Sequence, residues 1–422
     1  MIRRLLTRDI FSFMAVISLT AIALHTIGSL LSYSGFIEYP YAFAGVGRLD
    51  IPFGDLVQLT YTAGCESPIS ALADGSETCD PSGRPFNLMF PALYLFKLFQ
   101  IDQSKHLAAG GAIAIASLGS LIYFTAELRD ELRATSKLIF LGIILASHPM
   151  QLALERGNTD PAILTTLILF AVSFHHYLNG RSLPWLCSTG ITAAFSILFK
   201  LWAGPGMLVI LSLESLKTLR KSNFGKRFIQ LAFITIFLCA LFLAAYFGSG
   251  HVFRHTEAWE GHVSFGINAS YYHPSIADPG LIKGPIRAWK LLVVISSAAW
   301  WLSHGGSKKG ANGKETLALS SLSLELGFFT YLTVYLLSQS WDYRLICLAL
   351  TLPELLRRQD FRCRRSLVPI FLVSFVLLEL YIPVNWGLGL AETLSDFVVQ
   401  PALIGILLIE VVKPYRVSLN RR

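Results

Sequence analysis

Charged residues are scarce in this sequence. Asp, Glu, Lys and Arg make up 15% of its 422 residues, whereas hydrophobic residues make up 53%. A water-soluble domain carries about 25% charged residues, so the composition excludes an ordinary soluble enzyme and indicates a polytopic membrane protein. The formal net charge of +8 does not require a nucleic-acid partner, and we expect none, because basic residues collect in the cytoplasmic loops of membrane proteins.

Several signatures of soluble catalysis are also missing. The sequence has no phosphate-binding glycine loop, no G-x-S-x-G nucleophile motif and no H-E-x-x-H zinc motif. Segment 249–285 contains four histidines, but their spacing matches no zinc motif; they are His251, His255, His262 and His273. We therefore expect neither a metal nor a cofactor.

Long apolar runs take the place of these signatures. A membrane span needs about 20 apolar residues, and about 17 is the usual lower limit. We predict an all-α polytopic membrane protein with about 12 transmembrane helices, within a range of about 10 to 13, forming one integral membrane domain over residues 1–422. The expected helices cover residues 10–33, 104–126, 138–154, 160–178, 183–199, 202–216, 228–248, 286–303, 316–338, 342–356, 367–384 and 397–413.

Segment 87–101 contains a proline and a lysine and could either cross the membrane or lie at its surface. If it does not cross and both termini are cytoplasmic, most of the 35 Lys and Arg residues fall on the cytoplasmic side, as the positive-inside rule requires. A crossing would place the later basic loops outside. We therefore predict an interfacial or re-entrant helix here, and two large extracytoplasmic segments, 34–101 and 249–285.

The first of these segments carries the best carboxylates for proton chemistry, Asp50 and Asp55. Asp55 begins DLVQLTYTAG, which reads as a short amphipathic helix, so a helix-capping role is an equally good interpretation. Cys65 and Cys79 lie in the same segment. An exported loop permits a disulfide, and closing a loop of about 15 residues contributes about 3 kcal/mol. We predict this structural bridge, and two free thiols are the alternative.

The stretch ALERGNTDPAIL, residues 153–164, places a knot of polar residues between two apolar runs. A turn between helices needs one or two such residues, for example as a helix cap. This stretch has Glu155, Arg156, Asn158 and Asp160. We therefore interpret it as part of a substrate site at the outer membrane boundary, with a solvated turn as the alternative.

Two further basic residues lie at outer helix ends. Lys200 is the only charged residue between Arg181 and Glu214, and an ionisable residue bounded by apolar spans is a functional-site hypothesis unless it snorkels to the surface. Arg344 follows Asp342 and Tyr343 and precedes an apolar run. Lysine can bind a phosphate as a point charge and arginine can bind one in a bidentate way. We predict Arg344, Lys200 and then Arg156 as ligands of a lipid phosphate.

Five motifs together resemble the glycosyltransferase-C superfamily, and most closely its family 87 membrane proteins. In chain order they are FGDL (53–56), CDPSGRPFN (79–87), ALERGNTD (153–160), LFKLWAGP (198–205) and SWDYRLI (340–346). The resemblance covers most of the chain. It departs from the family after GRPFN, where LMFP follows, and after Lys200, where Leu-Trp-Ala-Gly follows.

The resemblance implies catalysis on the extracytoplasmic face of a bacterial inner membrane, from a polyprenyl-phosphate sugar donor to a lipid or glycan acceptor. It implies Asp55 as general base, and it adds Arg84 and Asn87 of GRPFN to the substrate-binding residues. The predicted substrate-binding set is Glu155, Asn158, Asp160, Arg84, Asn87, Asp342 and Tyr343. A transporter or flippase of a lipid-linked or anionic substrate, and a lipid-linked glycan polymerase or ligase, are the alternatives.

Overall fold

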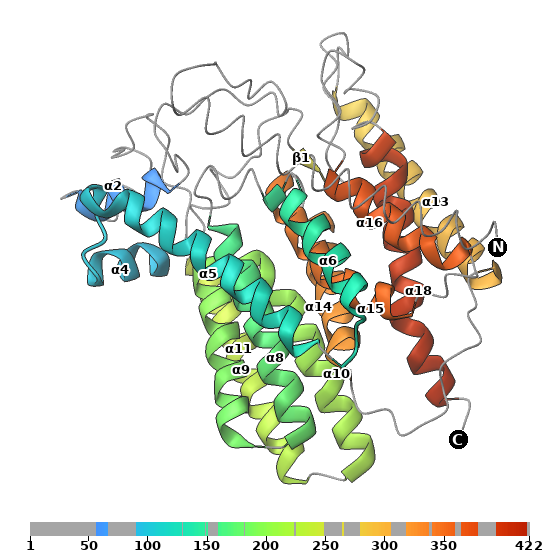
Figure 1. Ribbon diagram of the computed structural model, residues 1–422, viewed down its shortest axis with the longest axis horizontal. Helices are drawn as coiled ribbons and strands as arrows, with labels where there is room; N and C mark the ends of the chain where they lie inside the picture. Colours follow the sequence, from blue (N-terminus) through green and yellow to red (C-terminus); the bar gives the residue numbers. More distant parts are fainter. Residues whose placement is uncertain are drawn as a thin grey trace. The chain divides into compact units, whose positions relative to one another are not determined.

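The computed structural model of the protein describes residues 56–65, 90–128, 130–147, 149–150, 159–180, 182–222, 225–248, 264–265, 279–304, 318–336, 340–358, 364–378 and 394–419. Helices dominate this part of the chain (Figure 1). The only strands in it are β1 (Ser264–Phe265) and β2 (Ser340–Trp341), which pair antiparallel. The chain forms two compact units: unit 1 comprises residues 1–48, 128–151 and 258–422, and unit 2 comprises residues 49–127 and 152–257.

The protein is built from apolar helices of membrane-spanning length. Within the described ranges five qualify by length and composition, namely Gln103–Glu127, Asp160–Gly180, Lys226–Gly248, Leu319–Leu336 and Ser395–Val412. Three shorter apolar helices accompany them, α6 (Ala134–Ala146), α9 (Leu183–Phe199) and α16 (Val368–Leu378). All lie at or near predicted helices. The total of about 12 spans stays a prediction.

Unit 2 is a bundle whose central member is α8 (Asp160–Gly180). This helix packs against α5 (His106–Glu127) on one side and α9 on the other, and most of its side chains are buried. Hydroxyl groups connect the three helices: Thr189 donates to Ser173 at 3.1 Å, Thr166 bonds Ser196, and Ser120 donates to Thr165 at 3.3 Å. Small and hydroxyl residues at helix contacts are typical of membrane bundles, because they let backbones approach and bond.

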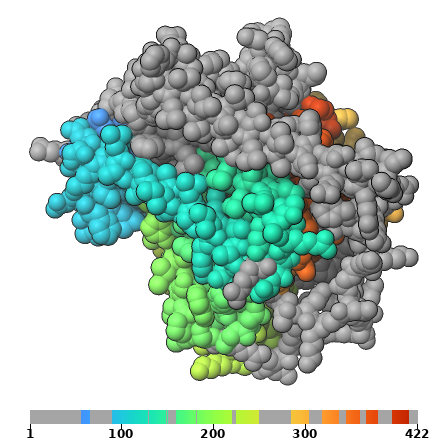
Figure 2. All heavy atoms as spheres, in the orientation of Figure 1, coloured from blue at the N-terminus to red at the C-terminus, as the bar shows by residue number. Residues whose placement is uncertain are grey.

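The outer helices of unit 2 expose apolar side chains. α10 (Gly204–Ser222) packs on α11 (Lys226–Gly248), and α11 also packs on α9. In α11, the side chains of Ile229, Phe233 and Ile236 are exposed. Exposed side chains of α5 are apolar as well, including Leu107, Ile115 and Ile122, and this helix lies on the face seen in Figure 2. A contiguous apolar exterior of this kind suits contact with lipid chains rather than water.

Two short helices pack beside the start of α5. α2 (Val57–Gly64) coincides with the short helix predicted after Asp55, and it packs against α4 (Phe90–Leu98) and the turn η2 (Gln103–Lys105). α4 has nine residues and is therefore about 14 Å long, too short for a hydrocarbon layer of about 30 Å. Whether segment 87–101 crosses the membrane stays a prediction.

Unit 1 contains two helical pairs. α13 (Pro279–His304) packs along α18 (Gln400–Leu419), which follows the π-helix η8 (Ser395–Val399). α14 (Leu319–Leu336) packs against η4 (Asp342–Thr351) and α15 (Leu352–Arg357), and η5 (Arg364–Leu367) leads into α16. The carboxylate of Glu131 accepts the backbone N–H groups of Leu319 and Ser320 at 2.7 and 2.9 Å, so it caps α14.

Some predicted boundaries were wrong. α6 ends at Ala146 rather than near 154, because Ser147 is extended and Pro149 follows, and the residue before a proline disfavours helix. α13 begins at Pro279, seven residues before the predicted start at 286. The predicted α-helix over 342–356 begins as a ten-residue 3-10 segment, η4. The predicted helix 10–33 lies outside the described residues.

Gly405 sets the distance between α13 and α18. A Cβ at this position would lie 2.2 Å from Ser297 Oγ and 2.3 Å from the carbonyl oxygen of Val294. Because the carbonyl belongs to a helix backbone, it cannot move aside cheaply. We expect Gly405→Ala to lower the free energy of unfolding by about 1 to 3 kcal/mol, as overpacking does, and to lower the melting temperature of the protein in detergent.

The matched control is Gly111→Ala in α5, where an added Cβ would meet nothing within 4 Å. Alanine is a better helix former than glycine by about 0.8 to 1.0 kcal/mol, so this variant should melt at the wild-type temperature or above. Equal melting of wild type and Gly405→Ala would show that the two helices are not held at this distance.

Candidate functional site

The structure describes only some of the predicted site residues. Asp160, Lys200 and Arg344 are described with their side chains, and Asp342 and Tyr343 only as backbone within η4. The others lie outside the described residues, and their roles stay predictions: Asp55, Arg84, Asn87, Glu155, Arg156, Asn158 and Cys79. The structure brings two of the described residues together, Asp160 and Lys200.

Asp160 and Lys200 form a buried ion pair in unit 2. The Lys200 Nζ lies 2.8 Å from Asp160 Oδ1, the carboxylate side chain is fully buried, and the lysine side chain is 11% exposed. Trp202 donates its indole N–H to the same carboxylate oxygen at 3.1 Å. The pair joins residues 40 positions apart, so it connects the beginning of α8 to the end of α9.

Local backbone structure explains how these three side chains meet. Asp160 is the first residue of α8, where the helix dipole favours a negative charge, and Pro161 follows at a position that proline tolerates. Lys200 ends α9 with extended dihedrals (φ −151°, ψ 115°), and the 3-10 turn η3 (Leu201–Ala203) comes next. The break turns the chain sharply enough for both Lys200 and Trp202 to reach Asp160.

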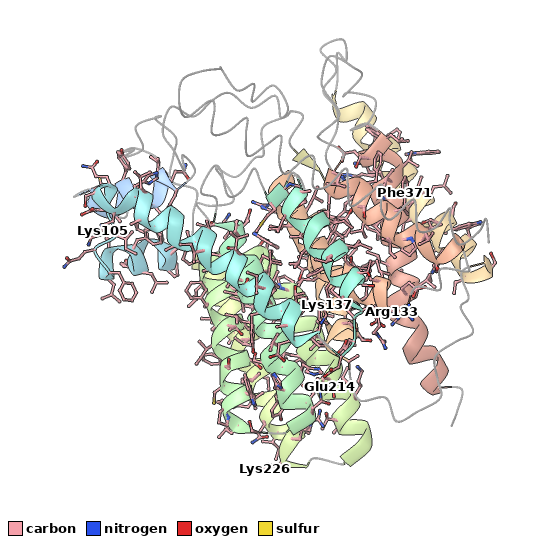
Figure 3. The ribbon with its side chains drawn as sticks, in the orientation of Figure 1. Lys105, Arg133, Lys137, Glu214, Lys226 and Phe371 are labelled. Atoms are coloured by element: carbon pink, nitrogen blue, oxygen red, sulfur yellow. The ribbon has the colours of Figure 1, made fainter. Side chains whose placement is uncertain are left out.

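The segment after Asp55 packs at the same end of unit 2. Thr60 of α2 is hydrogen-bonded to His106 Nδ1 at 2.9 Å, and His106 is the first residue of α5. Phe96 of α4 lies 6.5 Å from Phe199, the last residue of α9, between ring centroids. We call this region the Asp160 end; Lys105 marks it in Figure 3, whereas Glu214 and Lys226 mark the opposite end of the unit.

A second aspartate of this region, Asp102, is half-buried. Asp102 caps η2 and accepts the Ser104 hydroxyl at 2.6 Å and the Ser104 N–H at 2.9 Å. These two hydrogen bonds hold the pKa of the Asp102 carboxyl below its usual value. The Asp102 side chain also lies beside α2, since a Cβ on Gly64 would come within 3.4 Å of it. Asp102 is therefore a capping residue that stays ionised.

Cys65 immediately follows α2 and is disulfide-bonded. Its partner lies outside the described residues, so the pairing with Cys79 stays a prediction. The described cysteines with free thiols are Cys187, Cys239 and Cys347. A crosslink at the end of α2 restricts the segment that carries Asp55.

Arg344 belongs to unit 1, unlike Asp160 and Lys200. It is half-buried near the start of η4, three residues after the β2 residue Trp341. Its membership of one lipid-phosphate site with Lys200 stays a prediction.

Sequence reasoning missed two members of the Asp160 end. Trp202 lies in the KLWAGP break and was not predicted to belong to the site, although a buried indole N–H usually finds a hydrogen-bond partner. His106 was not recognised because a single histidine at a helix start carries little information. The spacing of the motifs gives no signal for either contact, since both depend on how the helices pack.

Chemically, the Asp160 end offers an ammonium group that a buried carboxylate holds in position. A preorganised ammonium group stabilises an anion that develops during a reaction. Comparison of the chain with protein-family models, with curated proteins and with solved structures found no match.

The ion pair makes a measurable prediction about stability. Removing one partner of a buried pair leaves an uncompensated charge, which costs about 3 to 5 kcal/mol. We expect Lys200→Met to lower the free energy of unfolding by about that amount, and the double variant Asp160→Asn/Lys200→Met to recover a large part of it. Denaturant unfolding in detergent would measure both. A loss below about 1 kcal/mol for Lys200→Met would mean that the pair behaves as a solvated surface pair.

Proposed function

We propose that this protein is a membrane glycosyltransferase that moves a hexose, with mannose favoured, or a pentose from a polyprenyl-phosphate donor to a lipid or glycan acceptor. One observation carries the proposal: α2, which begins two residues after Asp55, packs at the end of unit 2 that holds the Asp160–Lys200 pair. The proposed base precedes this helix by two residues in the sequence, and the positioned cation comes from a distant part of the chain.

The proposal includes a membrane orientation. With about 12 spans and both termini cytoplasmic, the Asp160 end faces the extracytoplasmic side of a bacterial inner membrane. Exposed apolar side chains along α5 and α11 support contact with lipid. A site in this position can take its sugar from a lipid-linked donor and needs no nucleotide sugar.

In the proposed reaction the acceptor hydroxyl attacks the anomeric carbon of the donor sugar while Asp55 takes the hydroxyl proton. The bond from this carbon to the phosphate oxygen breaks, and negative charge grows on the polyprenyl phosphate. Asp160 holds the Lys200 ammonium in position to stabilise that charge. Arg344 and Arg156 are the further proposed phosphate ligands.

The remaining predicted residues would bind the sugar and the acceptor. Carboxylates accept hydrogen bonds from hydroxyl groups, amides accept and donate them, and guanidinium groups donate them. These properties suit Glu155, Asp342, Asn158, Asn87 and Arg84. Tyr343 would contribute a ring face and a hydroxyl. Asp160 acts on substrate through Lys200, because its own carboxylate is fully buried.

A transporter of an anionic substrate is the second candidate. The observation that favours it is Lys290, which lies well inside α13 and is fully buried, since charges buried within helices often mark substrate or ion pathways. Uptake of labelled substrate into proteoliposomes without any covalent transfer of sugar would favour this function over glycosyl transfer.

Asp55→Asn tests the proposed base. Membranes containing this variant, incubated with radiolabelled polyprenyl-phosphate mannose, should transfer label to endogenous lipid or glycan at least about a hundredfold more slowly than wild type, the contribution expected of a general base. Asp102→Asn is the matched control, because Asp102 lies beside α2 yet serves as the cap of η2. It should retain wild-type transfer. Normal transfer by Asp55→Asn would eliminate Asp55 as the base.

The orientation is tested by cysteine labelling at two exposed positions at opposite ends of unit 2, Lys105 before α5 and Asn179 near the end of α8. The background carries Cys187→Ser, because Cys187 is an exposed free thiol. A membrane-impermeant maleimide added to intact cells should modify Lys105→Cys and spare Asn179→Cys. The reverse pattern would invert the proposed topology.

A further inference from the structure

Unit 1 contains a lysine with no exposed surface in the middle of an apolar helix. Lys290 of α13 is 0% exposed, and its Nζ lies 5.9 Å from the ring centroid of Tyr335 and 5.2 Å from that of Phe397. Asp396 of η8, 3% exposed, supplies the opposite charge that acts on it. A buried ammonium requires such a partner, and cation–π contacts with two rings add to the attraction.

Polar side chains continue from this pair into α14. Gln400 donates to Asp396 Oδ1 at 2.9 Å and to Ser395 Oγ at 3.3 Å, and Tyr331 donates to Gln400 Oε1 at 3.3 Å. Tyr335 is 2% exposed, and its hydroxyl has no hydrogen-bond partner among the described residues. A buried hydroxyl of this kind is rare and calls for an explanation. The ring that carries this hydroxyl has its centroid 5.9 Å from the Lys290 ammonium group.

The apolar helical stretch Ser395–Val412, which contains Asp396, carries a second buried carboxylate with a different partner. Glu410 of α18 is 8% exposed, bonds Arg358 at 2.8 Å and accepts the Trp301 indole N–H at 2.6 Å. Arginine is not deprotonated in proteins, whereas a buried lysine changes its protonation readily. The two carboxylates therefore differ in one decisive respect: only the cation beside Asp396 can give up its proton.

We infer that Lys290 and Asp396 form a proton-binding site in unit 1, separate from the Asp160 end. In one state a carboxylate and an ammonium face each other. Transfer of a proton from Lys290 Nζ to an Asp396 carboxyl oxygen gives a neutral amine and a carboxylic acid, with no change in total charge. Uptake of one more proton from solvent restores the ammonium and leaves the carboxylic acid, so that the site gains one positive charge.

Few other ionisable groups lie around the pair among the described residues. α14 presents Tyr331 and Tyr335, and its half-buried Glu325 lies ten residues before Tyr335, about 15 Å along the helix axis. Arg287 is one turn before Lys290 on α13 and is exposed. α16 also packs on η8, and its sequence VPIFLVSFVLL contains no ionisable side chain. Within the described part of the chain, Lys290 and Asp396 are therefore the groups that mainly set the proton affinity of the site.

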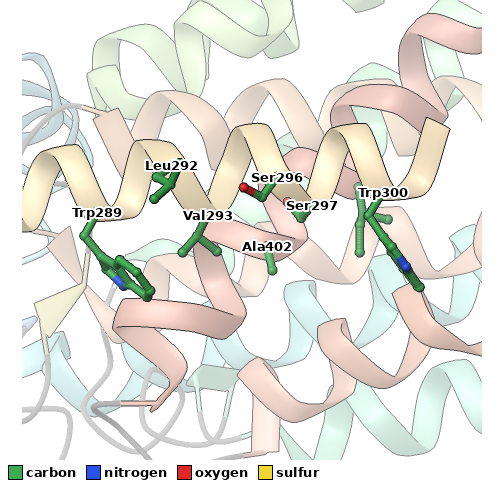
Figure 4. A pocket seen from close by; sticks show the side chains of 8 residues that line it. Trp289, Leu292, Val293, Ser296, Ser297, Trp300 and Ala402 are labelled. Carbon is green, nitrogen blue, oxygen red and sulfur yellow. The ribbon is translucent and has the colours of Figure 1, made fainter. Parts of the chain in front are cut away.

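An apolar groove gives a lipid-soluble reagent access to this part of α13. It is open, has a volume of about 420 Å³, and runs between α13 and α18, where Trp289, Val293 and Ala402 line it (Figure 4). Trp289 precedes Lys290 and donates its indole N–H to the carbonyl oxygen of Phe397 at 3.1 Å. The groove wall thus adjoins the residues that flank the buried pair.

Dicyclohexylcarbodiimide tests the inference, because it adds to a protonated carboxyl in an apolar environment and not to a carboxylate. The full-length protein in lipid nanodiscs would be treated from about pH 5 to about pH 9, the range that buried lysines and carboxyls reach, and modified peptides quantified by mass spectrometry. We expect adduct on Asp396 that declines as pH rises. Glu410 should remain unmodified throughout and serves as the internal control.

Two substitutions separate proton exchange from simple burial. Lys290→Arg keeps the positive charge but cannot release a proton, so it should lower Asp396 modification at least about tenfold, the effect of one pKa unit. Lys290→Met leaves the carboxyl without a counter-charge and should raise modification across the pH range. Wild-type protein unmodified at Asp396 at every pH, or modification unchanged in Lys290→Arg, would overturn the inference. Sugar transfer by these variants is measured separately, so the outcome does not depend on the proposed glycosyl transfer.

Discussion

A carboxylate buried at the beginning of an apolar helix must have a cation beside it, and Asp160 imposes this requirement on unit 2. The Lys200 ammonium meets it at 2.8 Å, with the Trp202 indole as a further donor. To supply both groups the chain breaks between α9 and α10 and turns through η3. The position of the helix ends, and with it the geometry of the Asp160 end, follows from this one charge.

In unit 1, two buried carboxylates near opposite ends of the stretch Ser395–Val412 also have cationic partners, and these partners differ chemically. Glu410 is matched by a guanidinium, which fixes its ionisation and makes it a structural tie between α15 and α18. Asp396 is paired with the Lys290 ammonium group, which also lies near the rings of Tyr335 and Phe397. Burial alone does not distinguish a structural carboxylate from a functional one; the acidity of its cationic partner does.

Sequence patterns predicted the helices of this protein better than its sites. Apolar runs located α9 at residues 183–199 and the start of α8 at Asp160, because lipid-facing and core residues are both apolar and the polar boundaries are sharp. The polar knot at 153–164 drew attention to Asp160, and the isolated charge drew attention to Lys200. Their mutual contact could not be predicted, since it joins residues 40 positions apart through packing. Lys290 lies within the predicted helix 286–303, and its burial could not be predicted because it depends on the surrounding helices.

The π-helix η8 changes which face of the helix the neighbouring residues occupy. A π turn contains one more residue than an α turn, and each residue of an α-helix advances by about 100° around the axis. A helical wheel drawn at constant pitch through residues 395–412 therefore assigns Asp396 to a neighbouring face from the one it occupies. Which side of the helix carries the carboxylate is a matter of rotational phase, so the loss of a single residue from η8 would turn Asp396 away from α13 while leaving hydropathy and composition almost unchanged.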